Sequence, residues 1–62
     1  MAWLAVGKSG IEQIFELNPI RWSDYAWFPV WRTNSVFLPK GSIAKLIGRE
    51  LTWEDEPVEL KE

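Results

Sequence analysis

The stretch AWLAVGKSGIEQIFEL (residues 2–17) decides the fold, because two strand-like runs flank a short connection with glycine at both ends. An apolar run at 2–6 is followed by GKSG at 7–10, and polar and apolar residues then alternate over 11–17. Two such runs joined by a short glycine-containing loop are typical of a β-hairpin. We therefore predict antiparallel strands over 2–6 and 11–17, with Asn18-Pro19 ending the second, since proline donates no ladder hydrogen bond.

An aromatic segment, RWSDYAWFPVW (residues 21–31), follows the predicted hairpin. With the two-residue period of a strand, Tyr25, Trp27, Pro29 and Trp31 share one side. Pro29 restricts such a strand to a sheet edge or a bulge. Turn residues come next, so we predict strands over 25–31 and 35–38 that pair as a second hairpin.

After Gly41 the apolar residues recur with the spacing of a helix instead of a strand. Ile43, Leu46 and Ile47 recur at the spacing of one helix face, and Ser42 suits the N-cap position. Gly48 suits the position just after the last helical turn. These residues predict a helix over 43–48, which a turn through Leu51 would lengthen if Gly48 lies inside it.

The acidic C-terminal tail, residues 52–62, carries two conflicting patterns. Thr52 and Asp55 have the spacing of a helix capping box, whereas Pro57 would stop a helix within a turn. We predict an extended segment at 57–60, laid along the sheet. Taken together, these patterns predict one small α+β domain over residues 1–62: a mostly antiparallel sheet with one short helix in its C-terminal part.

Composition narrows the functional classes. The chain of 62 residues has no cysteine and no histidine, which removes disulfides, thiolate zinc sites and the usual general base at neutral pH. The run Glu54-Asp55-Glu56 is typical of a solvated tail rather than of a cation site. We expect no enzyme, no metal and no cofactor. Stability must come from dense packing of five tryptophans or from self-association.

The charge pattern is asymmetric. Residues 1–48 carry five basic and three acidic side chains (+2), and residues 49–62 carry two basic and six acidic ones (−4), which gives the net −2. Nucleic-acid binding is not expected from a net acidic chain with scattered basic residues. The sequence has no apolar run long enough to span a membrane and no secretory signal, so we expect a cytoplasmic protein.

The aromatic segment is either the core of a very small protein or a binding surface. Both of its sides are apolar, whereas one helix and one small sheet cover one face well. The other face should then be exposed, or covered by a partner or a second copy. Exposed rings beside arginines stack on flat ligands and are enriched at protein interfaces. The candidate binding residues are Arg21, Trp22, Tyr25, Trp27, Trp31 and Arg32.

The ending LPKGSIAKLIGRELTWEDEPVEL (38–60) and the opening MAWLAV with GIEQIFELNPIR (10–21) resemble short phage or prophage proteins of gut Bacteroidales. The resemblance implies a small protein that acts by binding. We therefore expect a phage-encoded, non-enzymatic interaction module that associates with itself or with a host protein through the aromatic surface. A nucleotide-binding sponge acting against host defence signalling is the alternative, and a minor virion component is a further one.

Overall fold

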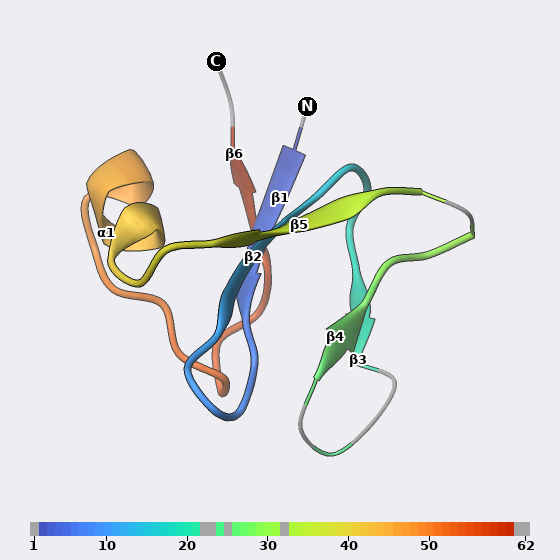
Figure 1. The fold of residues 1–62 in the computed structure, drawn as a ribbon, viewed down its shortest axis with the longest axis horizontal. Helices are drawn as coiled ribbons and strands as arrows, with labels where there is room; N and C mark the ends of the chain where they lie inside the picture. Colours follow the sequence, from blue (N-terminus) through green and yellow to red (C-terminus); the bar gives the residue numbers. More distant parts are fainter. Residues whose placement is uncertain (1, 22–23, 25, 32, 61–62) are drawn as a thin grey trace.

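The structure is a computed structural model that describes residues 2–21, 24, 26–31 and 33–60. These residues form six strands and one helix (Figure 1). In chain order, the elements are β1 (Ala2–Val6), β2 (Glu12–Phe15), β3 (Ile20–Arg21), β4 (Trp27–Phe28), β5 (Ser35–Leu38), α1 (Ser42–Ile47) and β6 (Val58–Leu60). All strand pairs are antiparallel. The predicted α+β class is therefore confirmed.

β1 and β2 form the predicted hairpin. Their antiparallel register runs from Val6↔Glu12 to Trp3↔Phe15, and the N–H of Gly7 donates to the carbonyl of Ile11 at 2.8 Å across the turn. The second strand is shorter than predicted, because the chain bends just after Phe15, at residues 16–17, and leads into β3.

A four-stranded sheet in the order β5-β2-β1-β6 forms the centre of the molecule. The prediction of a second hairpin over 25–38 is wrong, since β5 pairs with β2 and β4 pairs with β3. β4 is only two residues long, where a strand over 25–31 was predicted. Pro29 follows β4 directly, and Trp31 then takes a positive φ of 56°. A proline and a left-handed residue in succession separate β4 from β5.

Side chains alternate between the two sheet faces along β1. Leu4 and Val6 lie on the face covered by α1, where they form a buried cluster with Ile43 and Leu51. The half-buried apolar residues around this cluster are Ile14, Leu38, Ile47, Val58 and Leu60. In Figure 1, α1 lies on the left of the sheet and the β3–β4 ribbon on the lower right.

The opposite sheet face holds a second cluster. Ala5 and Phe15 are buried there against Trp27 of β4, with Trp3 and Trp53 packed beside them. The sequence led us to expect that one face of the aromatic segment is covered by the chain itself and that the other is exposed, or covered by a partner or a second copy. Trp27 packs against the chain's own sheet, because β3 and β4 form a separate ribbon over that face. Phe28, the next residue of β4, is exposed.

α1 begins and ends next to left-handed glycines. Gly41 has a φ of +93°, Gly48 has a φ of +78°, and the N–H of Gly48 donates to the carbonyl of Ala44. The predicted N-cap role of Ser42 is wrong: Ser42 is the first helical residue, and its hydroxyl donates to the carbonyl of Pro39 at 2.6 Å. Glu12 of β2 supplies the cap instead, as described below.

The C-terminal segment is extended, as predicted at its end. β6 pairs with β1 in the register Leu4↔Val58 to Ala2↔Leu60. The Thr52–Asp55 pattern closes a turn, because the N–H of Asp55 donates to the carbonyl of Thr52 at 3.0 Å. No helix follows this turn in the described residues, and Pro57 lies between it and β6.

Candidate functional site

Trp27 is a structural anchor rather than part of an exposed face. Its side chain is only 5% exposed, and its indole Nε1 donates to the carbonyl of Val6 at 3.0 Å. β6 pairs with β1 no further than Leu4↔Val58, so this carbonyl is outside that ladder. A buried indole N–H usually finds such an acceptor. Trp27 therefore ties β4 to the central sheet.

Arg21 completes this anchor. Its guanidinium carbon lies 4.5 Å from the ring centroid of Trp27 and 4.3 Å from that of Trp53. The two rings meet edge to face, with centroids 5.7 Å apart and planes at 64°. Arg21 Nη2 also donates to the carbonyl of Trp53 at 2.7 Å. The guanidinium thus links β3 to the segment before β6 through cation–π contacts and a hydrogen bond.

The structure describes three of the six predicted binding residues, and these three differ in exposure. Trp27 is in the core, and Arg21 is held by two rings and a carbonyl. Trp31 is 91% exposed, as a binding residue should be. The remaining three, Trp22, Tyr25 and Arg32, lie outside the described residues.

A groove of about 390 Å³ lies between β4 and the edge of the sheet at β2 and β5. Gln13 of β2 and Phe37 of β5 are cross-strand partners on its floor. Phe37 is 69% exposed, and Ile11 and Phe28 are exposed as well. We call this site the β4–β5 groove; its lining residues are Gly7, Ser9, Ile11, Gln13, Ala26, Trp27, Phe28, Pro29 and Phe37.

No lining residue of the β4–β5 groove carries a charge. Ser9 and Gln13 are its polar side chains, so it can accept apolar groups and form a few hydrogen bonds. Sequence reasoning missed Phe37 and Ile11 as candidate binding residues. The available signal was the uncharged SVFL run at 35–38, which has apolar residues at consecutive positions and hence on both faces of its strand.

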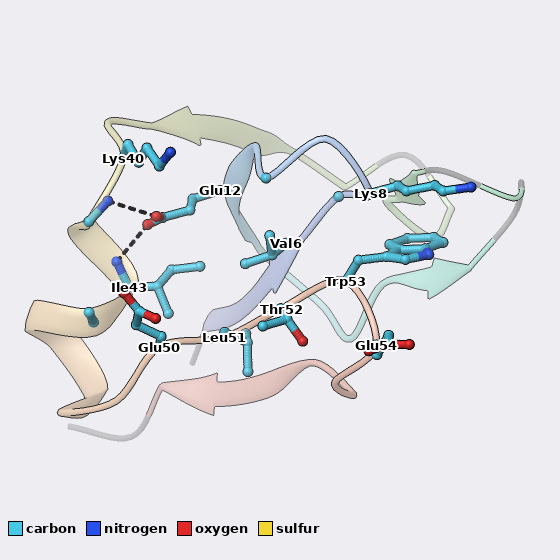
Figure 2. Close-up of a pocket in the computed structure, with 14 residues that line it drawn as sticks. Val6, Lys8, Glu12, Lys40, Ile43, Glu50, Leu51, Thr52, Trp53 and Glu54 are labelled. Atoms are coloured by element: carbon cyan, nitrogen blue, oxygen red, sulfur yellow. Dashed lines mark hydrogen bonds between the residues drawn. The ribbon is translucent and has the colours of Figure 1, made fainter.

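A second pocket, of about 470 Å³, lies between the β1–β2 turn, the start of α1 and residues 50–54 (Figure 2). Its most defined polar feature is the carboxylate of Glu12. Oε2 accepts the N–H of Gly41 at 2.7 Å, and Oε1 accepts the N–H of Ile43 at 2.8 Å, both drawn as dashed lines in Figure 2. These N–H groups are free at the start of a helix, and a carboxylate is a favourable partner for them.

The other charged residues around this pocket are of both signs: Lys8, Lys40, Glu50 and Glu54. Glu12 already has two donors, so it serves the fold. Among the described residues, no three acidic side chains are grouped so that they could hold a metal ion. The pocket therefore offers neither a uniform charge nor a nucleophile beside a base.

Thr52, at the rim of this pocket, holds the pKa of Asp55 below its ordinary value of 3.8. The backbone N–H of Thr52 donates to Asp55 Oδ2 at 2.9 Å and is the main cause. The Thr52 hydroxyl at 3.2 Å and the charge of Arg49 act in the same direction. Hydrogen bonds to a carboxylate favour its charged form. This arrangement closes a turn and is not reactive chemistry.

No helix in the described part of the chain is long and apolar enough to cross a membrane. No protein-family model, curated protein or solved structure matches this chain. The functional argument therefore depends on the geometry of the two pockets and on the exposed apolar side chains. Of the two, the β4–β5 groove is the better candidate binding site, because its apolar rings are exposed and its polar groups are few.

Proposed function

We propose that this chain is a non-enzymatic protein-interaction module that binds an apolar segment of a partner protein in the β4–β5 groove. The observation that carries the proposal is an exposed groove lined by Ile11, Phe28 and Phe37 without any charged residue. Exposed apolar surface of this kind marks interaction sites. Aromatic side chains in a pocket are also typical anchors of protein interfaces.

Trp31, two residues after the lining residue Pro29, adds support to the proposal. It combines a positive φ of 56° with 91% exposure. A bulky residue in the left-handed region costs about 1–2 kcal/mol relative to ordinary backbone, and an exposed indole recovers little of that cost through packing. Backbone strain of this kind is found at functional positions. We assign Trp31 to the partner-binding surface.

The chemistry of the groove favours a protein segment over a nucleotide. A nucleotide needs basic side chains for its phosphates, and the groove has none. Arg21, one of the candidate binding residues, donates to the carbonyl of Trp53. The nucleotide and virion alternatives, the phage origin and the cytoplasmic location stay predictions.

A peptide-display selection on the immobilised protein tests the proposal. We expect enriched peptides that carry two or more aromatic or aliphatic residues and that bind in solution. Phe28→Ser should weaken their binding at least about tenfold, the effect of losing one anchor of about 1.4 kcal/mol. Phe28→Leu, which keeps apolar surface, should retain most of the affinity.

Leu46→Ser is the matched control, because Leu46 is an exposed apolar residue on α1, away from the groove. It should leave peptide binding unchanged. The proposal is overturned if no peptide is enriched, or if Phe28→Ser and Leu46→Ser bind the selected peptides equally well. Thermal unfolding of each variant shows whether a loss of binding reflects a loss of folding.

A further inference from the structure

The two outer strands of the four-stranded sheet, β5 and β6, present free edges of different chemistry. An edge strand exposes unpaired N–H and C=O groups on which another strand can add. Proteins usually block such edges with charged residues or proline. Which backbone groups face outward follows from the hydrogen bonds that the structure contains.

The free edge of β6 is blocked. The Gly7 N–H donates to Ile11 O, so alternate residues of β1 from Gly7 backward face β2 and the residues between them face β6. Leu4 then bonds to Val58, which leaves Glu59 as the β6 residue whose backbone faces outward. Two residues earlier, Pro57 also faces outward, and it has no N–H to donate. A charge and a proline thus occupy this edge.

The free edge of β5 is open. The Glu16 N–H donates to Asn34 O at 3.1 Å, in line with the β2–β5 ladder. Asn34 therefore faces β2, and so do the residues two and four positions further along β5. The backbone groups of Ser35 and Phe37 must then point away from the sheet. The β1–β2 bonds predict the same alternation, because they leave the backbone groups of Glu12, Ile14 and Glu16 directed toward β5.

β5 is also uncharged, with the sequence SVFL. Val36 is 59% exposed on the helix-covered face of the sheet, opposite Ile14, and Phe37 is exposed on the other face. Pairing with another strand would bury part of both side chains. Among the described residues, β2 is the only strand that β5 pairs with.

A second copy of β5 fits this edge in one best register. When two copies are related by a two-fold axis normal to the sheet, odd-numbered residues of one copy lie opposite odd-numbered residues of the other, and even-numbered residues lie opposite even-numbered ones. With Val36 on the axis, Ser35 of each copy lies opposite Phe37 of the other, and both are residues with outward N–H and C=O groups. Each such pair exchanges two hydrogen bonds, which gives four. With Phe37 on the axis instead, Ser35 would lie opposite Pro39, which has no N–H.

We propose that two copies of this chain pair through β5 in this register, with Val36 at the two-fold axis, and so join two four-stranded sheets into one. The proposal concerns the edge of β5 and does not depend on the β4–β5 groove having a partner. Two four-residue strands bury less area than the roughly 1,200 Å² of a stable interface. We therefore expect a weak dimer, with a Kd in the range of about 1 μM to about 1 mM.

Hydrogen exchange on the unmodified protein tests the register directly. Spectra are compared at about 10 μM and about 1 mM, on either side of most of the expected Kd range. The amide protons of Ser35 and Phe37 should exchange more slowly at the higher concentration, whereas that of Glu59 should not change. Sedimentation velocity over the same range should show the transition from monomer to dimer.

Val36→Lys should abolish the dimer, because it places two like charges against each other at the axis. Val36 is on the sheet face opposite Phe37, so the variant leaves the groove intact and should still bind groove-selected peptides. Leu46→Lys, at an exposed apolar position on α1, is the matched control and should dimerise normally. Ser35→Pro, which removes an outward donor, is a second variant with the same expected loss.

A monomer at all concentrations overturns the proposal, as does a dimer that persists in Val36→Lys. Protection of Glu59 in place of Ser35 and Phe37 would assign the contact to β6. If the protein stays monomeric and these two amides are protected only when a groove-selected peptide is added, the edge takes a partner's strand and not a second copy. None of these results removes peptide binding, so the proposed function stands or fails on its own experiment.

Discussion

Glu12 and Ile43 are 31 positions apart in the chain, and the carboxylate of Glu12 accepts the backbone N–H of Ile43 at 2.8 Å. The same carboxylate accepts the N–H of Gly41 at 2.7 Å. One side chain of β2 thus satisfies two free donors at the start of α1. It holds the helix against the sheet face where Ile43 is buried.

Replacing Glu12 should therefore destabilise the protein through the helix. Glu12→Ala leaves two partly buried N–H groups without an acceptor, and we expect a loss of about 2 kcal/mol in the free energy of unfolding. Glu12→Gln keeps one acceptor oxygen and should lose about half as much. Urea denaturation followed by far-UV circular dichroism measures both. Glu16→Ala, at an exposed position just after β2, is the control, and an equal loss there would contradict the capping role.

The same substitution should have a large effect on stability at Trp27 and almost none at Trp31. Trp27→Phe removes the donor to the Val6 carbonyl and leaves a small cavity, so we expect a loss of about 2–4 kcal/mol. Trp31→Phe changes a side chain that is almost fully exposed and should stay within about 0.5 kcal/mol of the wild type. Denaturant titrations measure both losses.

Acrylamide quenching distinguishes the same two residues by accessibility. Trp31→Phe should remove readily quenched emission, and Trp27→Phe should remove protected emission. Protected emission that is lost in the Trp31 variant would show that the aromatic surface is covered in solution.

Arg21 should depend on its planar guanidinium and not on its charge alone. Arg21→Lys keeps the charge but loses the stacking on Trp27 and Trp53 and the geometry of the bond to the Trp53 carbonyl, so we expect a loss of about 1 kcal/mol. Arg49→Lys, at an exposed position, should change the free energy of unfolding by less than about 0.5 kcal/mol. Differential scanning calorimetry of the two variants makes the comparison, and equal midpoints would argue against the stacking.

Asp55 should make stability depend on pH in the acid range. Its pKa is lower in the folded chain than the ordinary 3.8, mainly through the backbone N–H of Thr52. A depressed pKa contributes stability that is complete above 3.8 and is lost as the pH falls from 3.8 through the folded-state value. Thr52→Val removes the hydroxyl donor alone and should move the pKa of Asp55 part of the way back up.

Carboxyl-carbon NMR titration between about pH 7 and about pH 2 measures the pKa of Asp55 directly. The stability advantage of the wild type over Thr52→Val should be present at neutral pH and should shrink below 3.8. A titration of Asp55 at or above 3.8 in the wild type would show that the Thr52 bonds are not maintained in solution.

The parts of the fold that were predicted are those with local signals. The β1–β2 hairpin follows from alternation around a glycine turn, and α1 follows from the spacing of Ile43, Leu46 and Ile47. The cap of α1 could not be predicted, because Glu12 is remote in sequence. β3 could not either, since two residues are too few to show a period.

The candidate site was harder to predict because the aromatic segment is apolar at every position around Trp27. Ala26 and Phe28 flank it, so the two-residue period gives no preference for which side faces inward. The orientation of Trp27 is decided by an acceptor at Val6, by the guanidinium of Arg21 and by the ring of Trp53 in a remote segment. Tertiary contacts of this kind have no counterpart in local patterning.

The blocked edge of β6 would also limit how far the assembly proposed through β5 can go. A sheet with two open edges can add a copy on each side and grow into a fibre. Here Pro57 and Glu59 close one side, so the pairing proposed for β5 would leave a dimer with no open sheet edge, and growth would end when two open edges have met. The blocked β6 edge would then prevent a chain with many exposed apolar residues from polymerising. Glu59→Val together with Pro57→Thr would unblock this edge.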